Sequence, residues 1–135
     1  MSVSVWVGNS VYEIGAASFL NSFFSTIYVR LEDKRWGSRF PVTMREFYSG
    51  HLSLSSAETA TSELRSIREM LARLPPDQLV RDFEDPAALP PGGPLSTEVT
   101  SLAEAFVTSD GKDLFDVLLR AFTEVAKKKK NLKIT

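Results

Sequence analysis

The sequence predicts an α+β fold in which a small antiparallel sheet packs against amphipathic helices. Apolar and polar residues alternate at the start of the chain, which is the pattern of a half-buried strand. Apolar residues recur at helical spacing over residues 57–74 and again over 112–129. The chain has 135 residues, 43% of them hydrophobic. That length and composition suit one domain with its own core, so we expect residues 1–135 to form a single domain.

The first element predicted is a hairpin. Val3, Val5 and Val7 occupy alternate positions, so a strand at this point would turn them to one face. The residues that follow, Gly8-Asn9-Ser10, favour a turn, and a second strand is expected after it.

A helix followed by a strand is expected over residues 16–31. Helical spacing relates Ala16, Phe19, Leu20, Phe23, Phe24 and Ile27. Ile27, Val29 and Leu31 then alternate with Tyr28 and Arg30, which favours a strand. Residues 32–38 read as a charged loop. Pro41 then suits the first turn of a helix that carries Met44, Phe47 and Tyr48 and ends near Gly50.

The clearest helix is expected from about Ala57 to Arg73. Its apolar stripe consists of Ala60, Leu64, Ile67, Leu71 and Leu74. Ser55 and Glu58 have the spacing of a capping box at its start, and Pro75 and Pro76 end it. Residues 78–83 alternate like a brief strand, and the Pro- and Gly-rich residues 85–94 predict a loop.

The last helix is expected from near Lys112 to Lys129. Ser109 or Asp110 can cap it, and Asp113 would lie in its first turn, where negative charge is favourable. Its core-facing side chains are Leu114, Phe115, Leu118, Phe122 and Val125.

The composition argues against most kinds of enzyme. The chain has no cysteine, so neither a disulfide nor a thiolate metal site can form, and His51 is its single histidine. A surface or loop-capping role suits His51 better than a catalytic one. The glycines lack the spacing of a phosphate-binding loop, and the acids near Asp110 lack that of a calcium loop. We therefore expect no catalysis, no metal and no cofactor.

The sequence also predicts a soluble protein of the reducing cytoplasm. The N-terminus lacks the basic and apolar regions of a secretory signal. Polar residues interrupt the most apolar segment of the chain, so it is too short to span a membrane. Five lysines close the chain, at 127–130 and 133. They have no aromatic residues among them, so a charged helix terminus explains them better than binding to nucleic acid or to a membrane.

Charge is unevenly distributed along the chain. Residues 77–126 contain 10 acidic and 3 basic side chains. An acidic surface of this kind would suit a basic protein partner, because complementary fields accelerate encounter. A simple solvated face explains the pattern equally well. Arg35, Trp36, Arg39 and Phe40 form a second group, with the composition of a binding hot spot, although core packing of the two aromatics would explain it too.

Four segments together resemble the immunity protein 70 family. They are residues 36–42, residues 74–80, residues 82–86 leading to 90–92, and residues 107–116. The resemblance extends from about Ala16 to Leu132. It implies a small intracellular bacterial protein, encoded beside a polymorphic toxin, that binds its cognate toxin domain and blocks it without catalysis. No catalytic residues follow from it.

Under that hypothesis two surfaces are candidates for toxin binding. The first is acidic and consists of Asp82, Glu84, Asp85, Asp110 and Asp113; the alternative consists of Trp36, Arg35 and Arg39. The same residues also have structural interpretations, with Asp110 as a helix cap and Trp36 in the core. Two other functions remain open: an adaptor unrelated to toxins, and a small hydrolase that uses carboxylates.

Overall fold

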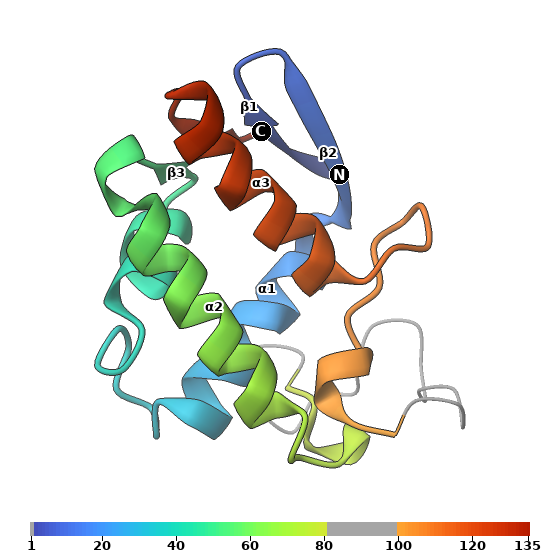
Figure 1. The fold of residues 1–135 in the computed structure, drawn as a ribbon. Coiled ribbons are helices and arrows are strands. Elements are labelled where there is room, and N and C mark those ends of the chain that lie inside the picture. Colours follow the sequence, from blue (N-terminus) through green and yellow to red (C-terminus); the bar gives the residue numbers. More distant parts are fainter. Residues whose placement is uncertain (1, 81–99) are drawn as a thin grey trace.

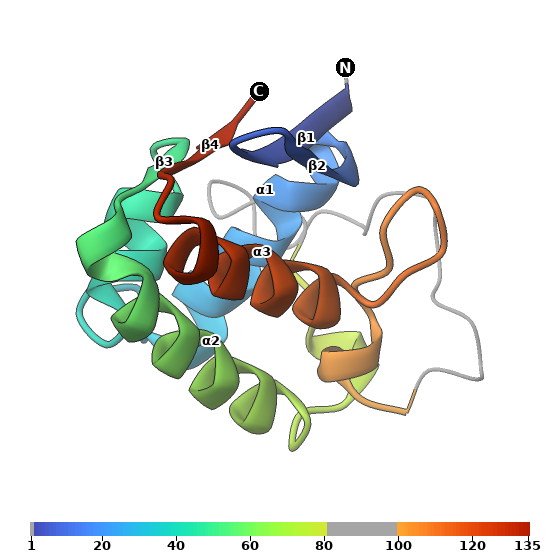
Figure 2. The same cartoon turned by 45° about the horizontal axis from the view of Figure 1, so that its top comes forward.

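The part of the chain that the structure describes contains a four-stranded antiparallel sheet and three main helices, an α+β fold as the sequence predicts (Figure 1). The computed structural model describes residues 2–80 and 100–135. The strands lie in the order β2-β1-β4-β3. Figure 2 shows the sheet at one end of the molecule, with α1 and α3 beneath it.

The opening hairpin is confirmed. Strand β1 (Ser2–Val7) pairs with β2 (Ser10–Ala16) through a tight turn, in which Gly8 has a φ of 58°. This left-handed conformation suits glycine, which has no Cβ to clash. The register shifts between Val3 and Ser4, where Ile14 forms a bulge in β2.

The last strand completes the sheet beside the first. Strand β4 (Leu132–Ile134) pairs with β1 on one side and with β3 (His51–Leu52) on the other. Val5, Val7, Leu52 and Leu132 are all fully buried, so the inner face of the sheet forms part of the core.

Helix α1 (Ala17–Thr26) continues into a π-helical turn, Ile27–Leu31, where the sequence predicted a strand. That prediction was wrong. Ile27 and Leu31 are both buried, and a separation of four residues places them on one helical face. The alternation at Val29 was therefore a coincidence within a short apolar run. Residues 32–38 form the expected loop.

The segment after Pro41 is helical, as expected, but it takes the π form over Val42–Phe47. Helix α2 (Ala57–Leu71) confirms the next prediction, with Ala60, Leu64, Ile67 and Leu71 fully buried. The predicted capping box is absent, since the 3₁₀ turn Leu54–Ser56 precedes the helix and its N-cap Ser56 makes no side-chain cap.

The described part of the brief strand expected at 78–83 is not a strand. Pro76–Gln78 form a 3₁₀ turn, and Val80 is bound by side chains of α1. The Ser22 hydroxyl donates to the Val80 carbonyl at 2.7 Å, and the Val80 N–H donates to Thr26 Oγ1 at 3.0 Å. The rest of that segment and the loop expected at 85–94 lie outside the described residues.

Helix α3 (Leu114–Lys128) lies beside α2 in front of α1 (Figure 1). All five residues expected on its core side are fully buried. Its N-cap is Asp113, whereas the sequence suggested Ser109 or Asp110. The Asp113 carboxylate accepts hydrogen bonds from the N–H groups of Phe115 and Asp116, at 2.8 and 3.3 Å.

Candidate functional site

A groove of about 470 Å³ separates the outer edge of β2 from the first turns of α3. We call it the β2–α3 groove. Its walls are Val11, Tyr12 and Glu13 from β2, Asp110 and Lys112 from the preceding loop, and Asp113, Asp116, Val117 and Arg120 at the start of α3. Two of the acids predicted as binding residues, Asp110 and Asp113, are therefore brought together.

The loop that closes one end of the groove is held by hydrogen bonds. The Thr108 N–H donates to the Lys112 carbonyl at 2.8 Å, and the Gly111 N–H donates to the Thr108 carbonyl at 2.9 Å. The Ser109 N–H donates to the Ile14 carbonyl at 3.1 Å, which attaches the loop to β2.

Asp110 is ionised at neutral pH in this loop. The hydrogen bond from the Thr108 hydroxyl lowers the pKa of its carboxyl group, and Lys112 lowers it further. The Lys112 Nζ lies 3.4 Å from the Asp110 carboxylate. Both side chains are exposed, so their ion pair adds little to the stability of the fold. It does hold the Asp110 carboxylate and the Lys112 ammonium group together at the rim of the groove.

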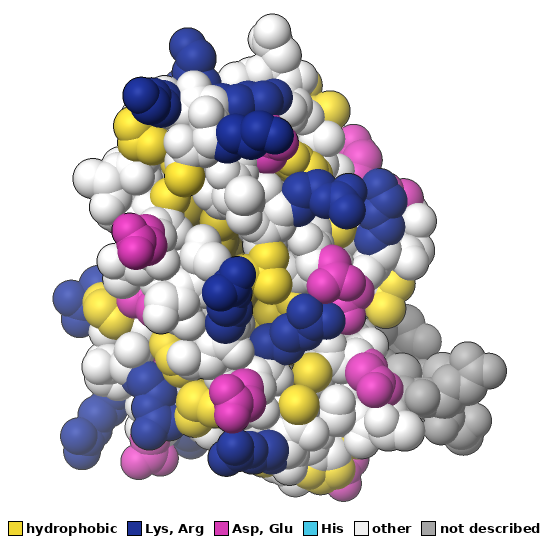
Figure 3. Space-filling model, in the orientation of Figure 1, with side chains coloured by type: hydrophobic (Ala, Val, Ile, Leu, Met, Phe, Trp, Pro, Cys, Tyr) yellow, Lys and Arg dark blue, Asp and Glu magenta, His cyan; other side chains and the backbone are white. Residues whose placement is uncertain are grey.

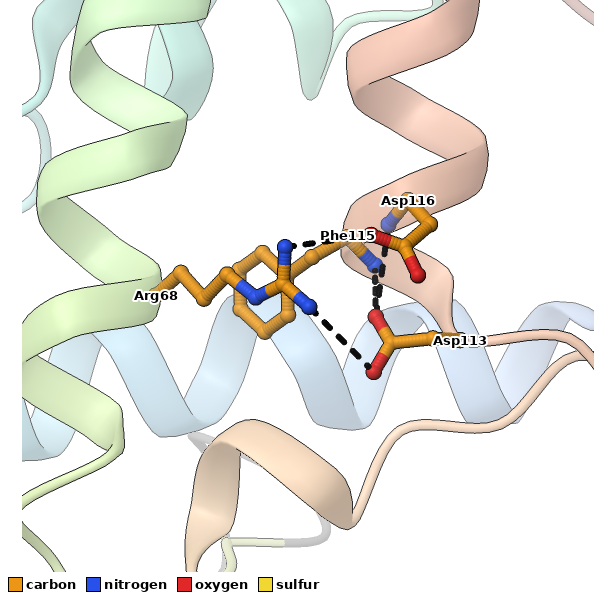
Figure 4. A network of polar contacts seen from close by, with 4 residues as sticks. All are labelled: Arg68, Asp113, Phe115 and Asp116. Carbon is orange, nitrogen blue, oxygen red and sulfur yellow. Dashed lines mark hydrogen bonds and ion pairs between the residues drawn. The ribbon is translucent and has the colours of Figure 1, made fainter.

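Asp113 and Asp116 both contact Arg68, which reaches across from α2 (Figure 4). The guanidinium lies 3.1 Å from Asp116 and 3.9 Å from Asp113, and it also lies over the ring of Phe115 at 5.9 Å. Asp113 therefore performs a structural task, because it caps α3 and joins α3 to α2 through Arg68.

Tyr12 forms part of the β2 wall and is protonated at neutral pH. Burial raises the pKa of its hydroxyl above the ordinary value of 10.0, the charge of Glu124 raises it further, and Arg120 acts in the opposite direction. The groove therefore offers a neutral phenol beside its charged groups.

Sequence reasoning missed several residues of the groove. Glu13, Asp116 and Arg120 line it, but on their own they read as ordinary exposed positions of a strand and a helix. The other predicted acids, Asp82, Glu84 and Asp85, lie outside the described residues.

The alternative candidates Arg35, Trp36 and Arg39 divide into two roles. Trp36 is half-buried between the rings of Tyr28 and Tyr48, with centroid distances of 5.0 and 4.7 Å, and its indole N–H donates to the Met44 carbonyl. It serves packing. Arg35 and Arg39 instead border a shallow depression together with Leu31, Glu32, Asp33 and Ser38.

One buried carboxylate organises this second surface. Glu32 is only 3% exposed, and its oxygens accept hydrogen bonds from three backbone N–H groups of the loop. The donors are Gly37 at 3.0 Å, Arg39 at 3.1 Å and Phe40 at 3.0 Å. The loop begins with Asp33 and Lys34, which both have left-handed backbones, with φ of 53° and 62°. Such conformations persist only where surrounding contacts impose them.

The lone histidine lies in a strand. His51 is half-buried in β3 opposite Lys133 of β4. Within residues 2–80 and 100–135, no group of three or more His, Asp or Glu side chains is arranged to hold a metal ion.

Charges of both signs cover the face formed by α2 and α3. Figure 3 shows acidic and basic side chains interleaved there, with basic ones gathered at the upper end. The excess of acids over residues 77–126 therefore does not give a uniformly acidic field on this face.

Comparison with known proteins gives one match. The family model described as Immunity protein 70 matches residues 5–134. Neither the curated proteins nor the solved structures contain a significant match. None of the helices in residues 2–80 and 100–135 combines the length and apolar character of a membrane span.

Proposed function

The chain belongs to the immunity protein 70 family, and on that premise we propose that it binds a cognate toxin domain and neutralises it by steric and electrostatic blockade. The observation that carries this proposal is the family match, which covers nearly the whole chain. We place this activity in the bacterial cytoplasm, with the toxin encoded nearby in a polymorphic toxin system, and we treat the chain as a single domain.

The geometry is consistent with an inhibitor that acts by surface fit. An inhibitor needs a rigid scaffold, and aromatic contacts in the core join α1 to α3 and to the segment Val42–Phe47. Phe23 of α1, for example, packs edge-on against Phe106 and Phe115 at 5.3 and 5.5 Å. A rigid scaffold limits the entropy lost on binding.

The carboxylates of the groove support binding better than hydrolysis. A hydrolase of the kind considered above needs two carboxylates that are free to move protons across a cleft. Here Asp113 and Asp116 share Arg68, and Asp110 pairs with Lys112. This leaves Glu13 as the one carboxylate of the groove without an ion pair to a described residue. We therefore propose that the chain has no enzymatic activity, and keep an adaptor role without a toxin as the alternative.

Co-expression with the neighbouring toxin domain tests this function. Cells producing active toxin should die with empty vector and survive with this chain, and an inactivated toxin should co-purify with it. An inactive toxin in the survival assay is the control for general toxicity of expression. Death despite abundant folded chain, together with absence of co-purification, would contradict the proposal and favour the adaptor.

A further inference from the structure

We propose that the outer edge of β2, which pairs with no other strand in the described residues, receives an extended segment of the toxin, which adds to the sheet as a further strand and enters the β2–α3 groove. This inference rests on the proposed function and specifies how the toxin is held. It commits to an extended segment because an edge strand offers backbone hydrogen bonds, which only another extended chain can match in spacing.

The hydrogen bonds of the sheet establish which backbone groups are free. Ser4 exchanges two backbone hydrogen bonds with Thr135, at 2.9 and 3.0 Å, so the polar groups of Ser4 point toward β4. In an antiparallel strand these groups alternate in direction, so those of Val5 point toward β2 and bond with its partner Tyr12. The neighbours of Tyr12, Val11 and Glu13, therefore point their N–H and carbonyl groups away from β1.

These outward groups have no partner in the part of the chain that the structure describes. Apart from the pairing of β1 with β2, in which they point away from β1, the main-chain groups of Val11 and Glu13 make no hydrogen bond to another described residue. The two N–H groups and two carbonyls thus lie along the outer edge of β2, where Val11 and Glu13 also line the groove. Beyond them, the Ile14 carbonyl is occupied by the Ser109 N–H, which limits the free stretch to Val11–Glu13.

The opposite edge of the sheet is less suitable. Strand β3 has only two residues, His51–Leu52. The chain that follows is already bound, since the Ser53 N–H donates to Glu46 and the Leu54 N–H donates to Asn131. The β2 edge is longer, and it lies beside a hollow.

Apolar surface next to the β2 edge would be covered by an added strand. Val11 is 47% exposed, and it lies directly opposite Trp6 of β1, which is 41% exposed. Side chains on neighbouring strands interact across such positions, so a partner strand beside Val11 would extend this exposed pair.

At the β2 edge, the position of Glu13 favours a basic side chain opposite it in the occupant. Four carboxylates and two cations line the groove. Asp113 and Asp116 contact Arg68, and Asp110 contacts Lys112. Glu13 makes only a hydrogen bond with the Ser4 hydroxyl, at 3.1 Å, and no ion pair with a described residue. An added strand would place a residue opposite Glu13, where lysine or arginine would complete the pair.

Amide hydrogen exchange on the unaltered protein tests this inference directly. The probe is the neighbouring toxin domain carrying an inactivating substitution. In the free chain the N–H groups of Val11 and Glu13 should exchange fast, and in the complex they should slow by about a hundredfold or more. The N–H of Tyr12 already bonds to β1 and serves as an internal control, slow in both states.

Each outcome has a separate meaning. A stable complex in which Val11 and Glu13 still exchange fast overturns the strand addition and leaves the proposed function intact. Absence of any complex overturns the proposed function and this inference with it. Slowing that grows with the concentration of the free chain alone would show that a second copy occupies the edge, and would also overturn the inference.

Substitutions give an independent test. Proline at an edge position removes an outward N–H without breaking an existing bond, so Val11→Pro should weaken toxin affinity at least tenfold relative to Val11→Ala. Glu13→Lys should slow association at low salt more than Glu69→Lys, which makes the same change of charge on α2. Circular dichroism verifies that each variant folds. If folded Val11→Pro binds like Val11→Ala, the proposed backbone pairing is wrong, and should Val11→Pro not fold, the exchange measurement decides.

Discussion

The carboxylate of Glu32 determines the conformation of the loop that follows it. It satisfies three N–H groups of a loop that would otherwise leave them without partners in a buried environment. Through these hydrogen bonds the carboxylate holds residues 33–40 in their loop conformation, which includes the left-handed backbone at Asp33 and Lys34.

Removing that carboxylate should destabilise the protein. We expect Glu32→Ala to lower the free energy of unfolding by about 2–3 kcal/mol, because buried donors lose their acceptor. Urea unfolding at pH 7 measures the change. Glu69→Ala is the matched control, since its carboxylate is 72% exposed and it should cost less than about 0.5 kcal/mol. Equal effects of the two substitutions would show that Glu32 has no special structural role.

A second carboxylate, Glu46, predicts how stability depends on pH. Burial acts to raise its pKa, but the N–H of Ser53, the hydroxyls of Ser56 and Ser53 and the charge of His51 outweigh that effect. The net pKa lies below the ordinary value of 4.5. A carboxyl group whose pKa is lowered in the folded state stabilises that state at pH values above its ordinary pKa. This stabilisation is lost as the pH falls through the folded-state pKa.

Glu46→Gln should therefore flatten the acid side of the stability profile. At pH 7 the variant should be less stable than the original chain by about 1 kcal/mol, a typical value for a hydrogen bond to a charged group in a partly exposed setting. The difference should shrink as the pH is lowered from 5 to 3. Urea unfolding at a series of pH values measures both, and a difference that stays constant over this range would exclude ionisation of Glu46 as the cause.

At the scale of elements, amphipathic spacing predicted the longest helices well and the short segments poorly. The stripes of α2 and α3 repeat over four turns, so chance agreement is improbable, and their core residues are buried as expected. Residues 27–31 offered a single short alternation, which fits a strand and a helical face alike. The packing of Ile27 and Leu31 decided between them, and packing is set by the rest of the fold.

Tertiary contacts also determine which residue caps the start of α3. Ser109, Asp110 and Asp113 are all good capping residues. The bridge between Val107 and Asp113, with the bond from the Leu114 N–H to the Phe106 carbonyl, holds residues 107–113 in a loop and lets the helix begin only after Asp113.

Asp113 should stabilise α3 in two separable ways. Asp113→Ala removes both the cap and the contact with Arg68 and should cost about 1–2 kcal/mol. Asp113→Asn retains a capping oxygen and loses only the charge, so it should cost less than half as much, since the contact with Arg68 is long and partly exposed. Urea unfolding of the two variants measures this. A larger loss for asparagine than for alanine would refute the assignment of Asp113 as the cap.

At the scale of the whole molecule, the class of fold and the family could be predicted from the sequence, but the shape of the site could not. Asp110 and Asp113 were singled out for their charge, and the structure shows them at the rim of one groove. Glu13 lies nearly a hundred residues away along the chain. Its place in the same groove depends on the bond between Ser109 and Ile14, for which the sequence gives no signal.

The acidic residues outside the described ranges still allow a prediction about association. We expect the combined change Asp82→Asn, Glu84→Gln and Asp85→Asn to slow association with the toxin about threefold to tenfold at low salt and to flatten its dependence on ionic strength. Stopped-flow association over a range of salt concentrations measures this, with dissociation expected to change little. Association that is unchanged at low salt would remove these three acids from the interface.

The pairing of β1 with β4 has a consequence for the order in which the sheet forms. Val5 and Ile134 lie almost a full chain length apart, yet their strands are neighbours in the centre of the sheet. During synthesis the hairpin emerges from the ribosome long before β4, so one edge of β1 lacks its neighbouring strand until residues 132–134 have been made. The centre of the sheet is therefore completed late in folding, after the hairpin and the three helices have been made.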